Sequence, residues 1–89
     1  MSRKRVYNQD TIAIMQRFFE AIEICRQNKL IPSYTEFCSD NNIDKAHFYT
    51  QRKDLGRGFF EVGWIVPLIK ECGISANWIM TGKGMMFTQ

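Results

Sequence analysis

A group of side chains that can bind phosphate or nucleic-acid bases lies between residues 45 and 57. Most of its members are basic, hydroxyl-bearing or aromatic. They are Lys45, Ala46, His47, Tyr49, Thr50, Arg52, Lys53 and Arg57. Lysine and arginine donate hydrogen bonds to phosphate oxygens and to guanine, and a methyl group can contact thymine. The chemistry that we expect from this stretch is non-covalent recognition of double-stranded DNA.

Catalytic chemistry is not what the sequence predicts. His47 is the only histidine, so a nucleophilic dyad would have to pair it with Cys38. Such a dyad needs an exposed thiol, whereas the helical phase turns Cys38 inward. No pair of carboxylates stands in an apolar setting that would tune them for acid–base work. We therefore expect a protein that is not an enzyme and uses no cofactor or metal.

The three cysteines, Cys25, Cys38 and Cys72, form no C-x-x-C pair, which argues against a zinc site or a disulfide framework. Each falls among apolar residues of a predicted helix, so we interpret them as small buried hydrophobes. Residues 1–6 carry positive charge but no apolar signal-peptide segment follows. The longest uncharged apolar run, residues 62–69, is too short to span a bilayer. The expected compartment is the cytoplasm.

The composition predicts one small globular domain over residues 1–89. Hydrophobic residues make up 45% of the chain and aromatic residues 13%, which is enough for one core. The formal net charge is +3, which permits nucleic-acid binding without requiring it. We expect an all-α fold with a basic arm over residues 1–8 and an apolar tail over residues 83–89.

A long first helix is predicted from Gln9 to Gln27, because apolar residues recur there at three- and four-residue steps. Asn28 is the expected stop, since asparagine tolerates the left-handed conformation. A second helix is expected after Pro32. Ser33 and Glu36 fit the S-x-x-E capping box. Residues 39–42 favour a turn and should end this helix.

The third helix should begin after Asp44 as N-cap and run to about Lys53. It has one narrow apolar stripe around Phe48 and an otherwise polar and basic surface, in which we include Gln51. A helix of this kind lies on the outside of a protein. Residues 54–58 form the turn that follows.

A fourth helix is expected over about Val62–Cys72, ending at Gly73. Pro67 lies inside it, so either the helix is kinked there or Pro67 is the first residue of a shorter helix. Ser75 should cap a short fifth helix, Ala76 to about Met80, which Gly82 ends.

The second and third predicted helices have the layout of a helix-turn-helix, in which the first helix braces and the second enters the major groove. Phe37 and Cys38 face inward, and the small Cys38 lets the two helices approach. Asn42 occupies the turn position that needs a left-handed residue. Ile43 plugs the turn, and Phe48 anchors the recognition helix.

With Phe48 buried, helical geometry points an outer set of side chains to solvent: Lys45, Ala46, Tyr49, Thr50 and Lys53. Lys45 and Ala46 are at the end of the helix that probes bases. Tyr49 and Thr50 can reach bases or phosphates. Lys53 suits phosphate oxygens.

Further phosphate contacts are expected from Arg57 and from free amides around Gly56 and Gly58. The basic arm, Arg3 to Arg5, could add phosphate or minor-groove contacts.

Residues 73–87, GISANWIMTGKGMMF, resemble the ending of phage lambda-type repressor DNA-binding domains. Those domains often close with G-[VI]-S-x-x-W-[LI]-[LM]-T-G-x-G-x-M-F. Trp78, Thr81, Gly82 and Gly84 all fall in place. The long first helix and the turn at 54–58 are similar to a variant group in phage-derived and Bacteroides-type bacterial proteins.

The resemblance covers about residues 33–87. It implies a five-helix repressor-like bundle and sequence-specific DNA binding in transcription regulation, often as a dimer. The helix-turn-helix segment matches loosely, with Asn42 in place of the usual glycine and Cys38 in place of the usual alanine.

An alternative function is that of a protein-binding adaptor or antirepressor that uses the same fold without binding DNA. Its support is the apolar tail Met85-Met86-Phe87, which could cover a second copy of the chain and form a homodimer. The other interpretation is that this tail folds back onto its own core.

Overall fold

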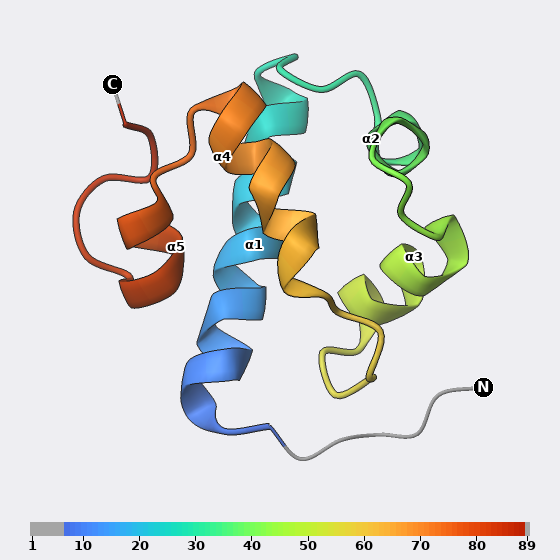
Figure 1. The fold of residues 1–89 in the computed structure, drawn as a ribbon, viewed down its shortest axis with the longest axis horizontal. Helices are drawn as coiled ribbons and strands as arrows, with labels where there is room; N and C mark the ends of the chain where they lie inside the picture. The colour runs from blue at the N-terminus through green and yellow to red at the C-terminus, as the bar shows by residue number, and fades with distance from the viewer. Residues whose placement is uncertain (1–6, 89) are drawn as a thin grey trace.

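The computed structural model describes residues 7–88. Within them the chain forms five α-helices and one turn of 3-10 helix, arranged around a long central helix (Figure 1). The elements are α1 (Gln9–Gln27), α2 (Tyr34–Asp40), α3 (Lys45–Lys53), η1 (Val62–Ile65), α4 (Val66–Cys72) and α5 (Ala76–Thr81). The prediction of an all-α fold with five helices is confirmed. The basic side chains of Arg3 to Arg5 lie outside the described residues.

Helix α1 supplies one wall of the core from Met15 to Cys25. It begins at the predicted residue because the side chain of Asn8 accepts a 2.8 Å hydrogen bond from the amide of Thr11. One face is buried, as the apolar spacing predicts. Its buried residues are Met15, Phe18, Ala21, Ile22 and Cys25.

The stop of α1 is where we expect it, but the conformational reason is different. Asn28 has φ −86° and is therefore not left-handed, and its amide still donates to the carbonyl of Ile24 at 2.9 Å. The reversal falls one residue later, on Lys29, which has φ 63°. The chain then turns back towards the end of α1, where the amide of Leu30 donates to the carbonyl of Cys25 at 2.8 Å.

Local side-chain caps define the starts of the short helices. The hydroxyl of Ser33 accepts from the amide of Glu36 at 3.1 Å, and the carboxylate of Asp44 accepts from the amide of His47 at 2.9 Å. Each bond satisfies an amide that the helix itself leaves without a partner. The predicted N-caps Ser33 and Asp44 are thus confirmed. Of the capping box predicted for α2, the structure shows the half that Ser33 contributes.

Pro67 is the second residue of α4, which begins at Val66. The structure is thus within one residue of the second predicted arrangement, a shorter helix that starts at the proline. Proline has no amide hydrogen and its ring clashes with the carbonyl four residues earlier, so one α-helix cannot run regularly through 62–72. The preceding residues, Val62–Ile65, instead form a 3-10 turn. The helix ends at Gly73, which is left-handed with φ 77°.

Helix α5 and the tail close the bundle on the side of α1 away from α3 (Figure 1). The hydroxyl of Ser75 caps α5 by accepting from the amide of Trp78 at 3.1 Å. The helix ends at Thr81, one residue later than predicted, and Gly82 follows with φ 77°. The tail then folds back, since the amide of Ser75 donates to the carbonyl of Met86 at 2.7 Å.

Aromatic rings fill the centre of the core, and Phe48 is the ring that joins α3 to it. Phe48 is fully buried. Its ring packs in edge-on and tilted arrangements that suit aromatic quadrupoles. The neighbouring rings, at 5.6–6.4 Å between centroids, belong to Phe18, Phe19, Tyr34, Phe37, Tyr49 and Trp64.

Candidate nucleic-acid interface

Helices α2 and α3 form a helix-turn-helix pair at one edge of the molecule (Figure 1). Asn42 takes the left-handed conformation in the turn, with φ 61°, as predicted. The amide of Ile43 donates to the carbonyl of Cys38 at 2.9 Å, and Ile43 packs against the core. Phe37 and Cys38 of α2 are buried, so the inward orientation that the sequence predicts for both residues is confirmed.

The outer face of α3 is defined by the two residues that it buries, Phe48 and Gln51. At 3.6 residues per turn, Ala46 and Lys53 lie opposite these two, and both are exposed. The predicted outward orientation of α3 is confirmed. Of the expected outer set, Thr50 alone is partly buried; the exposed members are Lys45, Ala46, Tyr49 and Lys53.

Tyr49 is held in place on this face by α2. Its hydroxyl lies 3.3 Å from the hydroxyl of Thr35, and its ring meets the edge of the Tyr34 ring at 6.3 Å. The side chain is still 39% exposed. Beside it lies a shallow depression of about 360 Å³, lined by Tyr49, Thr50, Arg52 and Lys53. Two hydroxyls and two cations around one hollow can donate hydrogen bonds to an anion.

Arg52 is less available than the sequence suggests, because its guanidinium lies over the ring of Tyr34 at 4.8 Å. Arg26 from α1 approaches the same ring at 5.5 Å. The hydroxyl of Tyr34 donates to the carboxylate of Glu23, and the neighbouring Arg26 guanidinium holds the pKa of Glu23 below its usual value. This cluster joins α1, α2 and α3, so Arg52 has a packing role as well as a charge.

His47 is exposed on the flank of α3 that faces the following loop. Its imidazole stacks on the ring of Phe59, with centroids 4.0 Å apart and planes 10° from parallel.

Cys38 is 1% exposed, and burial raises the pKa of its thiol to about 11. The predicted inward orientation of Cys38 is therefore confirmed.

The loop after α3 corrects one expectation about phosphate binding. The amide of Gly56 is not free, because it donates to the carboxylate of Asp54 at 3.0 Å. The amide of Arg57 likewise donates to the carbonyl of Asp54 at 3.1 Å. Asp54 thus organises this turn from within, in the manner of an Asx turn. The amides of Gly56 and Arg57 are thus already used within the turn and are not available to a phosphate.

The guanidinium of Arg57 is half-buried, with Nε 3.8 Å from the carboxylate of Asp54. The carbonyl of Arg57 accepts a 3.1 Å hydrogen bond from the hydroxyl of Tyr7. Arg57 is therefore anchored to the protein through its backbone.

Gln51 is the residue of this region that sequence reasoning misplaced. We expected it on the polar surface, whereas it is fully buried. The available signal was its position three residues after Phe48, on the same side of the helix. A hydrophobicity pattern misses it because glutamine counts as polar whether or not its amide finds partners inside the protein.

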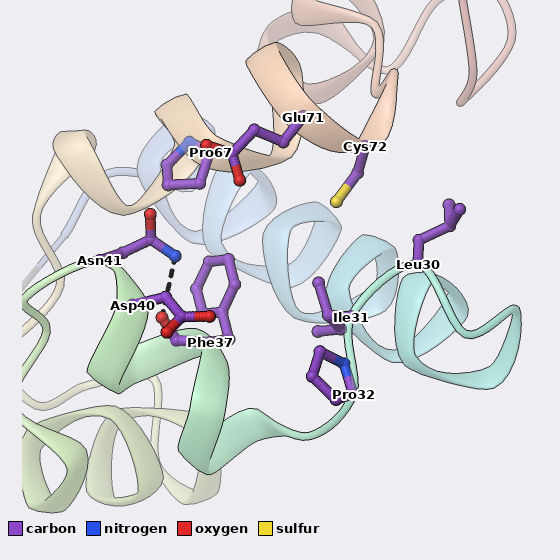
Figure 2. A pocket seen from close by; sticks show the side chains of 9 residues that line it. All are labelled: Leu30, Ile31, Pro32, Phe37, Asp40, Asn41, Pro67, Glu71 and Cys72. Atoms are coloured by element: carbon purple, nitrogen blue, oxygen red, sulfur yellow. Dashed lines mark hydrogen bonds between the residues drawn. The ribbon is translucent and has the colours of Figure 1, made fainter.

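A second concave feature lies away from α3, between α2, α4 and the segment that joins α1 to α2 (Figure 2). It is a cleft of about 100 Å³ with apolar walls and carboxylates on two sides. Its lining residues are Leu30, Ile31, Pro32, Phe37, Asp40, Asn41, Pro67, Glu71 and Cys72. The cleft shares no residue with the outer face of α3.

No protein-family model matches the chain, and neither a curated protein nor a solved structure matches it. Within residues 7–88, no helix has the length and apolar character needed to cross a membrane. The assignment to lambda-type repressors stays a prediction.

Proposed function

We propose that this chain binds double-stranded DNA sequence-specifically, with α3 in the major groove, and acts as a transcriptional regulator of phage-repressor type. The observation that carries the proposal is the two-sided character of α3. Phe48 anchors one side in the aromatic core, while basic and hydroxyl side chains cover the other. An α-helix with its side chains is about 10–12 Å across and the groove is about 12 Å wide, so one helix fits.

In this proposal the side chains of α3 and of the loop after it divide into two groups, those that contact bases and those that contact phosphates. Lys45 and Ala46, in the first turn of α3, contact base edges. Tyr49, whose hydroxyl is hydrogen-bonded to that of Thr35 in α2, contacts a base or a neighbouring sugar–phosphate group. Lys53 and Arg57 follow at the end of α3 and in the loop, where they contact phosphate oxygens and add affinity without sequence preference.

Selection from a random duplex library at moderate salt tests the proposal. An enriched motif is the expected result, and a palindromic motif would indicate a dimer, since half-site symmetry mirrors protein symmetry. Binding should weaken as salt rises, with about −0.9 added to the logarithmic slope for each neutralised phosphate. Failure to bind any duplex at ~50 mM salt would overturn the proposal.

A second candidate function is docking of a protein partner, and the cleft of Figure 2 is the observation that favours it. The carboxylates of Asp40 and Glu71 border apolar walls formed by residues such as Pro32 and Pro67. This combination is complementary to a basic side chain with an aliphatic stem. Under this alternative, Asp40→Asn with Glu71→Gln abolishes partner binding, whereas Lys53→Ala has no effect on it.

A further inference from the structure

The side-chain amide of Gln51 joins α3 to both ends of the loop that follows it. Its Nε2 donates to the carbonyl of Leu55 at 3.0 Å, and its Oε1 accepts from the amide of Phe59 at 2.8 Å. The second hydrogen of Nε2 points to the sulfur of Met15 in α1 at 3.4 Å. The amide is fully buried and its donors and acceptor all have partners.

These bonds determine the path of the loop. A backbone amide or carbonyl that loses its partner inside a protein is strongly disfavoured, so Leu55 and Phe59 are held close to Gln51. On the outer side of the same loop, the ring of Phe59 stacks on His47. Gln51 from within and His47 from outside therefore fasten residues 55–59 to successive turns of α3.

Arg57 lies between the two attachment points, and this position gives the network a functional consequence. Residues 55 and 59 are fixed relative to α3, so the backbone of Arg57 is fixed relative to Lys53 at the end of that helix. The phosphates of a duplex have a regular spacing. Two basic side chains can therefore contact the DNA backbone together only when the protein fixes the distance between them.

We propose that Gln51 is a positioning residue of the DNA interface, which holds the loop so that Arg57 contacts the phosphate backbone while α3 contacts the bases. The inference rests on the proposed function. Gln51 itself touches no DNA in this arrangement. It acts through Leu55 and Phe59, and Arg57 carries the charge.

The test is a double-mutant cycle read as the salt dependence of binding to the selected duplex. Gln51→Met keeps the volume of the side chain and removes both loop hydrogen bonds. We expect Gln51→Met and Arg57→Ala each to reduce the logarithmic salt slope by about 0.9, the share of one phosphate. Because both remove the same contact, the double variant should show the same slope as either single one.

A loss of stability alone does not change the number of phosphates contacted, so Ile79→Val serves as the matched control. Ile79 is fully buried in α5, and its truncation lowers the stability of the fold without touching the loop. Its salt slope should equal that of the unchanged chain. His47→Ala alters an exposed residue, keeps the fold, and should reduce the slope in the same direction as Gln51→Met.

Two results overturn the inference while leaving the proposed function in place. One is a salt slope that neither Gln51→Met nor His47→Ala alters. The other is additive losses in the double variant, which would mean that Gln51 and Arg57 act separately. Absence of duplex binding by the unchanged chain overturns the proposed function and this inference with it.

Discussion

The guanidinium of Arg17, in the middle of α1, donates a 2.7 Å hydrogen bond to the carbonyl of Ile79 near the end of α5. A second nitrogen of the same group donates to the carbonyl of Met80 at 3.2 Å. The last carbonyls of a helix have no partner within it, and a cation there also offsets the helix dipole. Arg17 thus joins the first and last helices of the fold.

The first prediction concerns Gly82, the residue at which α5 ends. Gly82 has φ 77°, and a Cβ added there would lie 2.9 Å from a nitrogen of Arg17. We expect Gly82→Ala to lower the free energy of unfolding by roughly 1–2 kcal/mol, the cost of a left-handed alanine. Urea denaturation measures it. Gly63→Ala is the control: that site has open space around it, and no loss of stability is expected.

Truncation of Phe48 tests the orientation of α3. The ring is fully buried among aromatic neighbours, so Phe48→Ala should cost about 3–5 kcal/mol, much of the stability of a small domain. Thermal melting followed by circular dichroism measures the loss. Lys53→Ala, at an exposed site of the same helix, should melt like the unchanged chain. Equal melting of Phe48→Ala and Lys53→Ala would mean that the assigned faces of α3 are wrong.

Helix boundaries could be predicted from the sequence because the interactions that set them are local. Ser33, Asp44 and Ser75 each cap a helix by accepting from the amide three residues later. Such a bond needs only the right residue type at the right spacing. The bond from Arg17 to Ile79 spans 62 positions and has no spacing signal, since only the folded chain brings the two residues together.

Some features of the candidate site could likewise be predicted from the sequence, and others could not. The outward orientation of Lys45 and Ala46 follows from the helical phase once Phe48 is inside. The stack of His47 on Phe59 and the buried bonds of Gln51 depend on the path of a loop, which no periodicity describes. The expectation of a free amide at Gly56 is wrong for a different reason: the carboxylate of Asp54, two residues earlier, already accepts from that amide. This is a local Asx-turn contact, which a pattern of residue types and spacing can predict.

Separate roles are expected along the proposed DNA-binding face. Lys45→Ala and Tyr49→Ala should change which sequences are preferred, because they remove contacts in the groove. Lys53→Ala should weaken binding to all sequences alike and reduce the salt slope by about 0.9. Competition binding with a set of single-base variants of the selected duplex measures both effects. A uniform loss for all three variants would contradict base recognition by α3.

Alkaline pH should destabilise the fold through its buried thiols. Burial raises the pKa of Cys38 from 9.0 to about 11 and that of Cys25 to about 12. Above pH 9 the unfolded chain releases these protons while the folded chain keeps them. The free energy of unfolding then falls as pH rises, by up to about 1.4 kcal/mol per pH unit for each thiol.

Urea denaturation between pH 8 and pH 11 would measure this dependence. The variant Cys38→Ala lacks one of the thiols, so its stability should fall less steeply above pH 9 than that of the unchanged chain. Tyrosine and lysine titrations are common to both proteins and cancel in the difference. Parallel stability curves for the two proteins would show that Cys38 does not contribute.

The tail gives the last prediction, because the structure shows which of its residues the core uses. Met86 and Phe87 are partly buried against the core, and the amide of Thr88 donates to the carbonyl of Gly73 at 2.8 Å. The tail therefore folds back onto its own core, which is one of the two interpretations that the sequence leaves open. Met85 differs from its neighbours, since its side chain is 81% exposed. Deletion of residues 85–89 should therefore lower the melting temperature, whereas Met85→Ser should leave it unchanged.

Met85→Ser also tests whether the tail forms a homodimer, which stays a prediction. Met85 is the tail residue whose apolar surface is still available to a second copy, and a methionine adapts well to such a contact. If the tail forms a two-fold interface, Met85→Ser should shift the mass from dimer towards monomer in sedimentation, with the helical signal intact. A dimer that persists in Met85→Ser would place the interface elsewhere on the chain. A chain that is monomeric at high concentration and on DNA would contradict the dimer altogether.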